Sequence, residues 1–163
     1  MPEIIVIAHN IRSTHNVGSI FRTCEGFGVV QLILSGYTPY PTIKNDTRLP
    51  HIANKLTAQI HKTALDAEQL VPFDYQAQPD FDSLRAQGFR VVGLEQDKAS
   101  IMLTDYTAPE KIVLLLGEEV EGIAADLRNQ CDDLIEIPMN GQKESFNVSV
   151  ATGIALYALN YKP

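Results

Sequence analysis

The strongest structural signal in this 163-residue chain is the segment Ile137-Pro-Met-Asn-Gly-Gln-Lys-Glu-Ser-Phe-Asn-Val-Ser-Val-Ala151. It leaves a short apolar strand, crosses a polar loop, and enters a helix whose apolar residues recur on or near one face. Such a junction presents free backbone N–H groups at the helix start, which is a natural seat for a polar or anionic ligand. The alternative is an ordinary helix that Ser145 or Asn147 caps, with nothing bound.

Upstream of this segment, apolar runs of strand length alternate with helical patterns. The runs are continuous rather than alternating, which is typical of parallel strands that are covered on both faces. Strands are predicted at 3–8, 29–34, 90–94, 111–116 and 134–137, and helices at 16–27, 51–62, 80–87, 123–130 and from about 148 onward. The pattern predicts a single α/β domain over residues 1–163, built on a parallel sheet. Residues 63–78 stay ambiguous, with one helical turn followed by a short extended piece around 71–75 as one interpretation, and residues 96–109 are connecting structure in which 100–103 suits a short helix or a short strand.

Composition sets the broad class. Hydrophobic residues make up 45% of the chain and charged residues 20%, which fits a globular protein without a membrane partner, and no apolar run reaches the length of a transmembrane helix. The N-terminus has no signal-peptide pattern. Two cysteines, Cys24 and Cys131, do not make a disulfide framework or a metal site. We therefore expect a cytoplasmic protein without a metal centre.

Charge is distributed unevenly along the chain. The net charge is −7, but residues 1–65 hold six Lys/Arg against three Asp/Glu, while residues 66–163 hold seven against seventeen. A polyanion is therefore expected to dock on the N-terminal part, unless the asymmetry is a solvated surface without a partner. The loop 37–50 interleaves Tyr37 and Tyr40 with Lys44 and Arg48, a pattern that suits phosphates and bases, or else a merely flexible loop.

Three loops that follow predicted strands are rich in polar residues, namely 10–22, 117–122 and 138–147. Ligands of open α/β sheets bind beyond the carboxyl ends of the strands, where these loops are expected to meet. The chain lacks G-x-G-x-x-G after its first strand, a Walker-type Gly-Lys-Ser/Thr, a Cys/His cluster and a G-x-S-x-G elbow. These absences argue against the common nucleotide folds, metal catalysis and α/β-hydrolases.

The three loops resemble the three motifs of the SpoU/TrmH branch of the SPOUT RNA methyltransferases. Asn16-Val-Gly-Ser-Ile-Phe-Arg-Thr-Cys-Glu-Gly-Phe-Gly28 resembles motif 1, Leu116-Gly-Glu-Glu-Val-Glu-Gly122 resembles motif 2, and Ile137 to Ala151 resembles motif 3. One departure is Phe146, where the family usually has Leu. Residues 37–110 match in layout rather than in motif.

The resemblance implies a SPOUT fold with a deep C-terminal trefoil knot, which binds S-adenosylmethionine. It also implies a homodimer, with the motif 1 helix and the terminal helix at the interface and each active site completed across it. The reaction would be methylation of a ribose 2′-hydroxyl in RNA. Relatives that act on large ribosomal RNA often carry an added N-terminal domain, for which this chain has no room, so tRNA is favoured over rRNA as the partner.

The resemblance further assigns candidate residues. Arg22 is the central catalytic candidate, either as a base that activates the hydroxyl or as a bidentate phosphate clamp. Asn16 would orient Arg22 or the ribose, or serve as a helix cap, and Glu119 would hold the arginine or backbone amides. Ser145 and Asn147 would bind substrate or stabilise the knot loop. Cofactor contacts are expected from Leu116, Gly117, Gly122, Ile137, Met139, Gly141, Ser145 and Phe146, and RNA contacts from Arg12, Lys44 and Arg48.

Two other functions are compatible with parts of this pattern. A non-catalytic RNA-binding or assembly module would keep the knot without turnover, although the joint presence of the five catalytic candidates speaks against it. A small-molecule methyltransferase would act without RNA, although the basic loop with its tyrosines speaks mildly against that.

Overall fold

The computed structural model describes residues 1–161 and contains one seven-stranded, fully parallel sheet. The strand order is β3-β2-β1-β6-β4-β7-β5. The strands are β1 (Glu3–His9), β2 (Gln31–Ser35), β3 (Phe73–Gln76), β4 (Arg90–Leu94), β5 (Ile101–Met102), β6 (Lys111–Leu116) and β7 (Asp133–Glu136). β1 and β6 form the centre of the sheet and pair over six positions.

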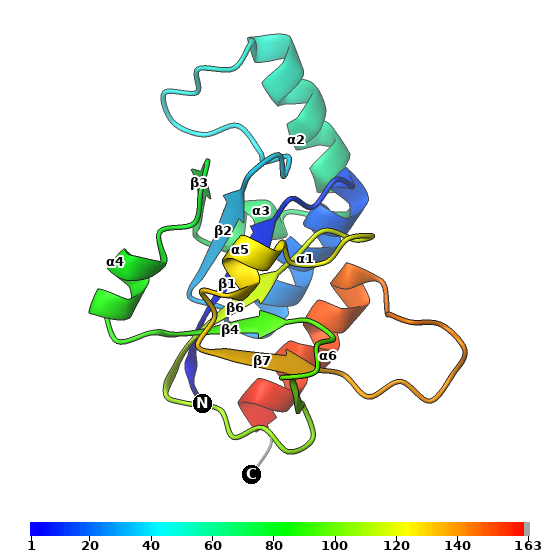
Figure 1. Cartoon of the computed structure of the whole chain (residues 1–163). Helices are drawn as coiled ribbons and strands as arrows, with labels where there is room; N and C mark the ends of the chain where they lie inside the picture. The colour runs from blue at the N-terminus through cyan, green and yellow to red at the C-terminus, as the bar shows by residue number, and fades with distance from the viewer. Residues whose placement is uncertain (162–163) are drawn as a thin grey trace.

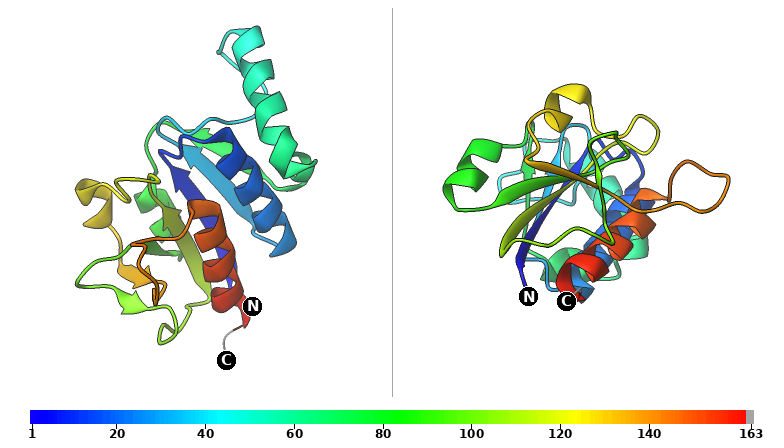
Figure 2. Two further views of the ribbon diagram at one scale, coloured as in Figure 1. Left: turned by 90° about the vertical axis from the view of Figure 1, so that its right-hand side faces the viewer. Right: turned by 60° about the horizontal axis from the view of Figure 1, so that its bottom comes forward.

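Helices cover both faces of the sheet (Figures 1 and 2). They are α1 (Thr14–Gly26), α2 (Pro50–Ala64), α3 (Ala67–Leu70), α4 (Phe81–Ala86), α5 (Ala125–Arg128) and α6 (Val148–Tyr161). Helices α1 and α6 lie side by side on one face, and α4 and α5 lie on the other side. Helix α2 projects beyond the end of the sheet (Figure 2). Within the described residues, no helix is long and apolar enough to span a bilayer.

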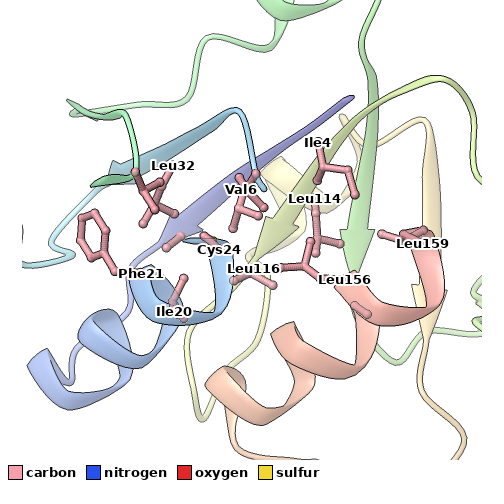
Figure 3. Packing of buried hydrophobic residues seen from close by; sticks show 14 of the residues in the cluster. Ile4, Val6, Ile20, Phe21, Cys24, Leu32, Leu114, Leu116, Leu156 and Leu159 are labelled. Atoms are coloured by element: carbon pink, nitrogen blue, oxygen red, sulfur yellow. The ribbon is translucent and has the colours of Figure 1, made fainter. Parts of the chain in front are cut away.

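The core explains why the central strands are continuously apolar. Successive side chains of a strand point to opposite faces, so Ile4 and Val6 pack towards α1 and α6, while Ile5 and Ile7 pack towards α4 and α5. Figure 3 shows the first of these clusters, where Leu156 of α6 meets the sheet. Both clusters are fully buried at the level of β1, so neither face tolerates a polar residue there.

The sheet confirms the predicted parallel α/β architecture and adds two strands. β3 and β5 fall in the segments that the sequence left ambiguous, and both lie at sheet edges, where short strands of four and two residues suffice. The predicted N-cap of the first helix was wrong. Ser13 caps α1 by accepting a hydrogen bond from the Asn16 amide, which leaves the Asn16 side chain free for other contacts.

Helix α2 crosses α1 at very short range, and a glycine permits this. A Cβ at Gly18 would overlap the backbone of Ile60 and Ala64 on α2, so only glycine fits there. The buried face of α2 consists of Ala53, Ile60 and Ala64. Ile52, near the start of the helix, is 42% exposed, because this end of α2 extends past α1.

Candidate active site

The loop after β6 folds back on itself as a tight hairpin. Glu118 and Gly122 exchange two backbone hydrogen bonds, of 3.0 and 2.9 Å, and Gly122 has a φ of +70°. A Cβ on Gly117 would overlap the backbone of Gly122 and Ile123. Glycine at these two positions therefore allows the two arms of the hairpin to lie close together, and a larger residue would prevent this.

Glu119, on this hairpin, connects it to the start of α1. Its carboxylate accepts hydrogen bonds from the Arg12 amide at 3.2 Å, the Ser13 amide at 3.3 Å and Asn16 Nδ2 at 3.2 Å. Partial burial opposes ionisation, but hydrogen bonds from the backbone amide of Glu119 itself and from these three donors outweigh it and lower the pKa of Glu119. Of the two roles expected for Glu119, the structure shows that of holding backbone amides rather than an arginine.

Asn16 also connects the start of α1 to the C-terminal helix. Asn147 Nδ2 donates to Asn16 Oδ1 at 3.1 Å. Asn147 Oδ1 in turn accepts from the Ser149 amide at 2.9 Å and from the Ser149 hydroxyl at 2.6 Å, so Asn147 is the cap of α6. Polar side chains from three distant segments thus form one chain of hydrogen bonds, Glu119–Asn16–Asn147.

A pocket of about 250 Å³ lies next to Glu119, beyond the carboxyl ends of β4, β6 and β7. Seven of the eight residues expected to contact a cofactor line it, namely Leu116, Gly117, Gly122, Ile137, Met139, Ser145 and Phe146. Gly141 does not line it, since this glycine is exposed and has open space around it. The expected cofactor contact of Gly141 stays a prediction.

Arg22 lies apart from this cluster. It is exposed on α1 and lines a separate surface hollow together with Lys62 of α2, rather than the pocket. Residues six apart on a helix point to different faces, so Asn16 faces Glu119 while Arg22 does not. Among the six arginines, all within the described chain, Arg22 alone makes no ion pair.

The family model that describes the SpoU rRNA Methylase family matches residues 3–157. The chain belongs to the SpoU rRNA Methylase family. Three similar proteins are a mouse tRNA (guanosine(18)-2′-O)-methyltransferase, TARBP1 (32% identical), a tRNA (guanosine(18)-2′-O)-methyltransferase of Aquifex aeolicus (31%) and a 23S rRNA (guanosine-2′-O-)-methyltransferase of Pseudomonas putida (30%). Each match covers 95–96% of this chain, which spans 9%, 67% and 58% of those proteins, respectively.

Solved structures of SpoU relatives share the fold. The TrmH/SpoU tRNA modifying enzyme of A. aeolicus superposes with a TM-score of 0.78 at 27% identity, over 98% of this chain and 74% of that one. An AdoMet-bound rRNA methyltransferase from Sinorhizobium meliloti gives a TM-score of 0.75 at 24% identity, over 97% of this chain and 56% of that one.

The pocket of this SpoU-family chain also contains residues that the sequence reading missed. Leu94, Glu95 and Gln96 line it from the end of β4. Glu95 accepts from the Ile123 amide at 2.7 Å and so anchors the far side of the hairpin, and the Gln96 side chain donates to the Glu144 carbonyl. The sequence does contain a signal for these residues, because they lie at the end of a predicted strand and ligands of parallel sheets bind at strand ends.

Acidic residues dominate the charge of the pocket lining. Six carboxylates line it, from Glu95, Glu118, Glu119, Glu121, Glu136 and Glu144. Glu118 has only 20% of its side chain exposed and lies 3.8 Å from the Arg12 guanidinium. Apolar side chains of Leu116, Ile137 and Val148 complete the walls. The site therefore favours a ligand that combines positive charge with an apolar group.

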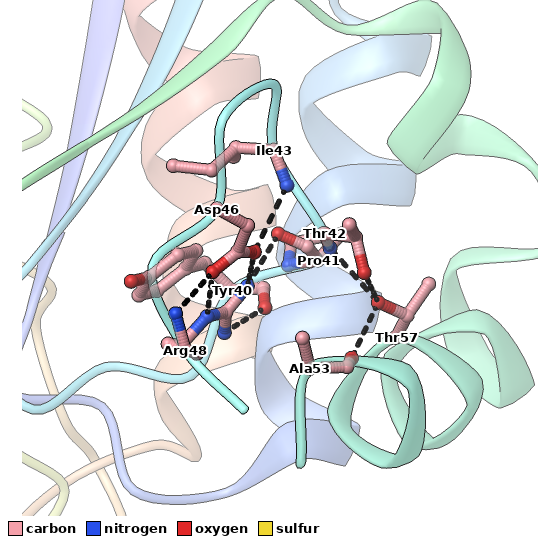
Figure 4. A network of polar contacts seen from close by, with 8 residues as sticks. All are labelled: Tyr40, Pro41, Thr42, Ile43, Asp46, Arg48, Ala53 and Thr57. Atoms are coloured by element: carbon pink, nitrogen blue, oxygen red, sulfur yellow. Dashed lines mark hydrogen bonds and ion pairs between the residues drawn. The ribbon is translucent and has the colours of Figure 1, made fainter. Parts of the chain in front are cut away.

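The three expected RNA contacts differ in their surroundings. Arg12 has 78% of its side chain exposed, and Lys44 is exposed in the loop before α2. Arg48 is held inside that loop: its guanidinium binds both oxygens of Asp46, at 2.9 and 2.6 Å, donates to the Tyr40 carbonyl at 2.8 Å and stacks on the Tyr40 ring (Figure 4). The structure thus gives Arg48 a part in shaping the loop, and its contact with RNA stays a prediction.

Proposed function

We propose that this chain is an S-adenosylmethionine-dependent methyltransferase that modifies a ribose 2′-hydroxyl of RNA. The observation that carries the proposal is the Glu119–Asn16–Asn147 chain of hydrogen bonds, which joins the three SpoU motif segments beside an acid-lined pocket. The names of the relatives, which act on guanosine 2′-O positions of tRNA and rRNA, support it.

The residues of the pocket suit this cofactor. S-adenosylmethionine carries a sulfonium and an ammonium against one carboxylate, so the carboxylates of the lining complement its excess positive charge. Leu116, Ile137 and Met139 offer apolar surface for the adenine, and the hairpin backbone at Gly117 and Gly122 offers polar groups without side chains in the way. When bound, the cofactor supplies an electrophilic methyl group on its sulfur.

The chain's own residues must position the RNA hydroxyl and help it lose its proton. We propose that Arg22 clamps a phosphate next to the target ribose through two parallel N–H donors. Its exposure and its lack of an ion pair in the described chain leave those donors available, and a guanidinium is intrinsically a poor base. Asn16, Glu119, Ser145 and Asn147 then act as binding or positioning residues around the site.

The Arg22→Lys variant tests whether Arg22 acts as a phosphate clamp or as a general base. A clamp loses its bidentate geometry but keeps its charge, so Arg22→Lys should raise KM for RNA and leave the pH–rate profile unchanged. A base would instead show a profile displaced towards the lower pKa of an amine. That displacement would refute the clamp.

We propose that the protein acts as a homodimer and that Arg22 reaches the pocket of the partner subunit. An apolar groove runs along α1 and α6, lined by Phe27, Ile154, Tyr157 and Tyr161. Tyr157 and Tyr161 are 63% and 55% exposed, which is a large apolar surface to leave in water. A second copy of the chain on this face would cover it and would also explain why Arg22 lies outside the pocket of its own chain.

Mixing two inactive variants tests this arrangement. Arg22→Ala and Gly117→Val remove different halves of the proposed site, so a mixed dimer contains one site with both changes and one intact site. Random assortment at equal amounts predicts recovery of about a quarter of wild-type activity. No recovery, in a mixture shown by mass spectrometry to contain mixed dimers, would place Arg22 and the pocket of one chain in the same site.

We further propose that residues 1–163 form one domain whose C-terminal segment is knotted. One continuous sheet supports the single domain. In support of the knot, β5 pairs with the outer edge of β7, and the Leu103 amide donates to the Glu136 carbonyl at 2.8 Å, while the chain after β7 returns across the sheet to α6 beside α1. Pulling on both ends by optical tweezers should then give a fully extended chain shorter than about 3.3–3.6 Å per residue. Full extension would disprove a knot.

We propose tRNA as the substrate and the cytoplasm as the compartment. Two of the named relatives are tRNA methyltransferases, and two free cysteines, Cys24 and Cys131, suit a reducing environment. The test is transfer of label from S-adenosylmethionine to total tRNA and, separately, to ribosomal RNA, both from cells that lack this protein, with Arg22→Ala as the matched variant.

The outcomes separate the candidate functions. Label in tRNA that is lost in Arg22→Ala, and that nucleoside analysis places at the 2′-oxygen, would confirm the proposal. Label in ribosomal RNA alone would reassign the substrate. If the protein transfers no label and binds no cofactor, the non-catalytic RNA-binding module remains. Methyl transfer to small molecules without RNA would indicate a small-molecule methyltransferase.

A further inference from the structure

Helix α2 carries a row of basic side chains on its solvent side. His51, Lys55 and Lys62 are all exposed, and their spacing of four and seven residues places them within about 40° of arc on a helix of 3.6 residues per turn. Ala53, Ile60 and Ala64 form the buried face on the opposite side. We call His51, Lys55 and Lys62 the α2 ridge.

The charge of the α2 ridge is not neutralised within the described chain. Helix α2 contains no Asp or Glu. Neither Lys55 nor Lys62 takes part in an ion pair, although six of the other Lys and Arg residues of the described chain do, and the protein as a whole has a net charge of −7. Lys44, Lys98 and Lys143 of the described chain also form no ion pair, but only Lys55 and Lys62 lie together on one face of a helix, so this row offers a surface for an external anion.

The α2 ridge is continuous with the proposed catalytic arginine. Lys62 and Arg22 line the same surface hollow, together with the polar side chains of Ser19, Thr23 and Thr63. The two helices can come this close because Gly18 has no side chain, and Thr63 Oγ1 fixes the crossing by donating to the His15 carbonyl at 2.8 Å. A chain of phosphates held by Arg22 would therefore continue onto Lys62.

We infer that the α2 ridge is a track for the RNA strand that flanks the target nucleotide. This inference rests on the proposed function. From His51 to Lys62 the ridge is about 16 Å long at 1.5 Å per residue, and α2 projects from the body of the molecule where a large RNA has access (Figure 2). Lysines on such a track contact phosphates and not bases, so they position the RNA without selecting its sequence.

The test compares Lys55→Gln/Lys62→Gln with the wild-type protein on unmodified tRNA over a series of salt concentrations. Each lost phosphate contact should reduce the slope of log K against log salt by about 1. KM for tRNA should rise, while the affinity for S-adenosylmethionine and the melting temperature should stay the same. Lys55→Arg/Lys62→Arg should restore binding, and Lys98→Gln, at an exposed lysine without an ion pair elsewhere in the described chain, is the matched control.

The result can overturn the inference in two distinguishable ways. A wild-type protein that methylates tRNA, together with a double glutamine variant of equal KM and equal salt slope, would refute the track and leave the proposed function intact. A wild-type protein that binds the cofactor but no RNA would refute both. A reduced slope in the double variant, with the control unchanged and the arginine variant restored, would confirm the track.

Discussion

Asn16 and Asn147 are 131 positions apart in the chain, yet their side chains are joined by a hydrogen bond of 3.1 Å. Each of them has a second contact on its own side, Asn16 with Glu119 and Asn147 with the amide of Ser149. The start of α1, the hairpin after β6 and the start of α6 are therefore held in one arrangement by amide and carboxylate groups. Disturbing any member should affect the others, because a network of this kind is cooperative.

Glu119→Gln should weaken the network at its centre. A glutamine keeps one acceptor oxygen where three N–H donors now meet a charged carboxylate, and hydrogen bonds to charged groups are worth about 1.5–3 kcal/mol each. We expect methyl transfer to fall by about tenfold or more, measured as kcat/KM on tRNA. Glu110→Gln, at an exposed glutamate away from the pocket, should behave as wild type. Equal activity of both variants would show that Glu119 does not organise the site.

Gly117→Val should strongly weaken cofactor binding. The new side chain would overlap the backbone of Gly122 and Ile123 and force the hairpin open, at a cost of about 1–3 kcal/mol for overpacking. Isothermal titration with S-adenosylmethionine should show an affinity reduced by at least about tenfold. Ala77→Val, at an exposed position, controls for the added methyl groups. Unchanged affinity in Gly117→Val would mean that the cofactor does not use this hairpin.

Arg48→Gln should lower the stability of the loop 37–49, and we expect this effect rather than a loss of RNA affinity. Arg48 binds Asp46, and hydrogen bonds from its guanidinium hold the pKa of Asp46 well below its usual range. A lowered pKa stabilises the fold at pH values above the ordinary value of 3.8, and this contribution is lost as the pH falls through the lowered pKa. Arg48→Gln should thus melt at a lower temperature at neutral pH, and limited proteolysis should cut the loop faster. Normal melting with weakened tRNA binding would instead support the RNA contact.

His61 should make stability depend on pH near neutrality. A hydrogen bond to Glu68, of 2.7 Å, raises the pKa of His61 above its ordinary value of 6.5. The charged pair therefore stabilises the junction of α2 and α3 fully below pH 6.5, and this contribution disappears as the pH rises through the raised pKa. Urea unfolding of wild type and His61→Gln over a pH series should show a difference that shrinks with rising pH. A constant difference would indicate that the imidazole does not titrate with unfolding.

The sequence by itself determined the class of the fold and the edge of the sheet at which the candidate site lies. Continuous apolar runs such as Ile4–Ala8 require burial on both faces, and this leaves a parallel sheet between helices as the solution. The three motif segments follow strands, and a parallel sheet brings strand ends to one edge. Seven of the eight expected cofactor contacts line the pocket for this reason.

Only the tertiary structure decided which polar groups meet. Periodicity reports which face of an element is buried, but not which distant donor lies opposite an exposed side chain. Ser13 rather than Asn16 caps α1, so Asn16 is free to join Glu119 to Asn147. Arg48 turns into its own loop, whereas Arg22 is left exposed beside Lys62. These partnerships depend on long-range packing, such as the close crossing of α1 and α2, and no local pattern of residues encodes them.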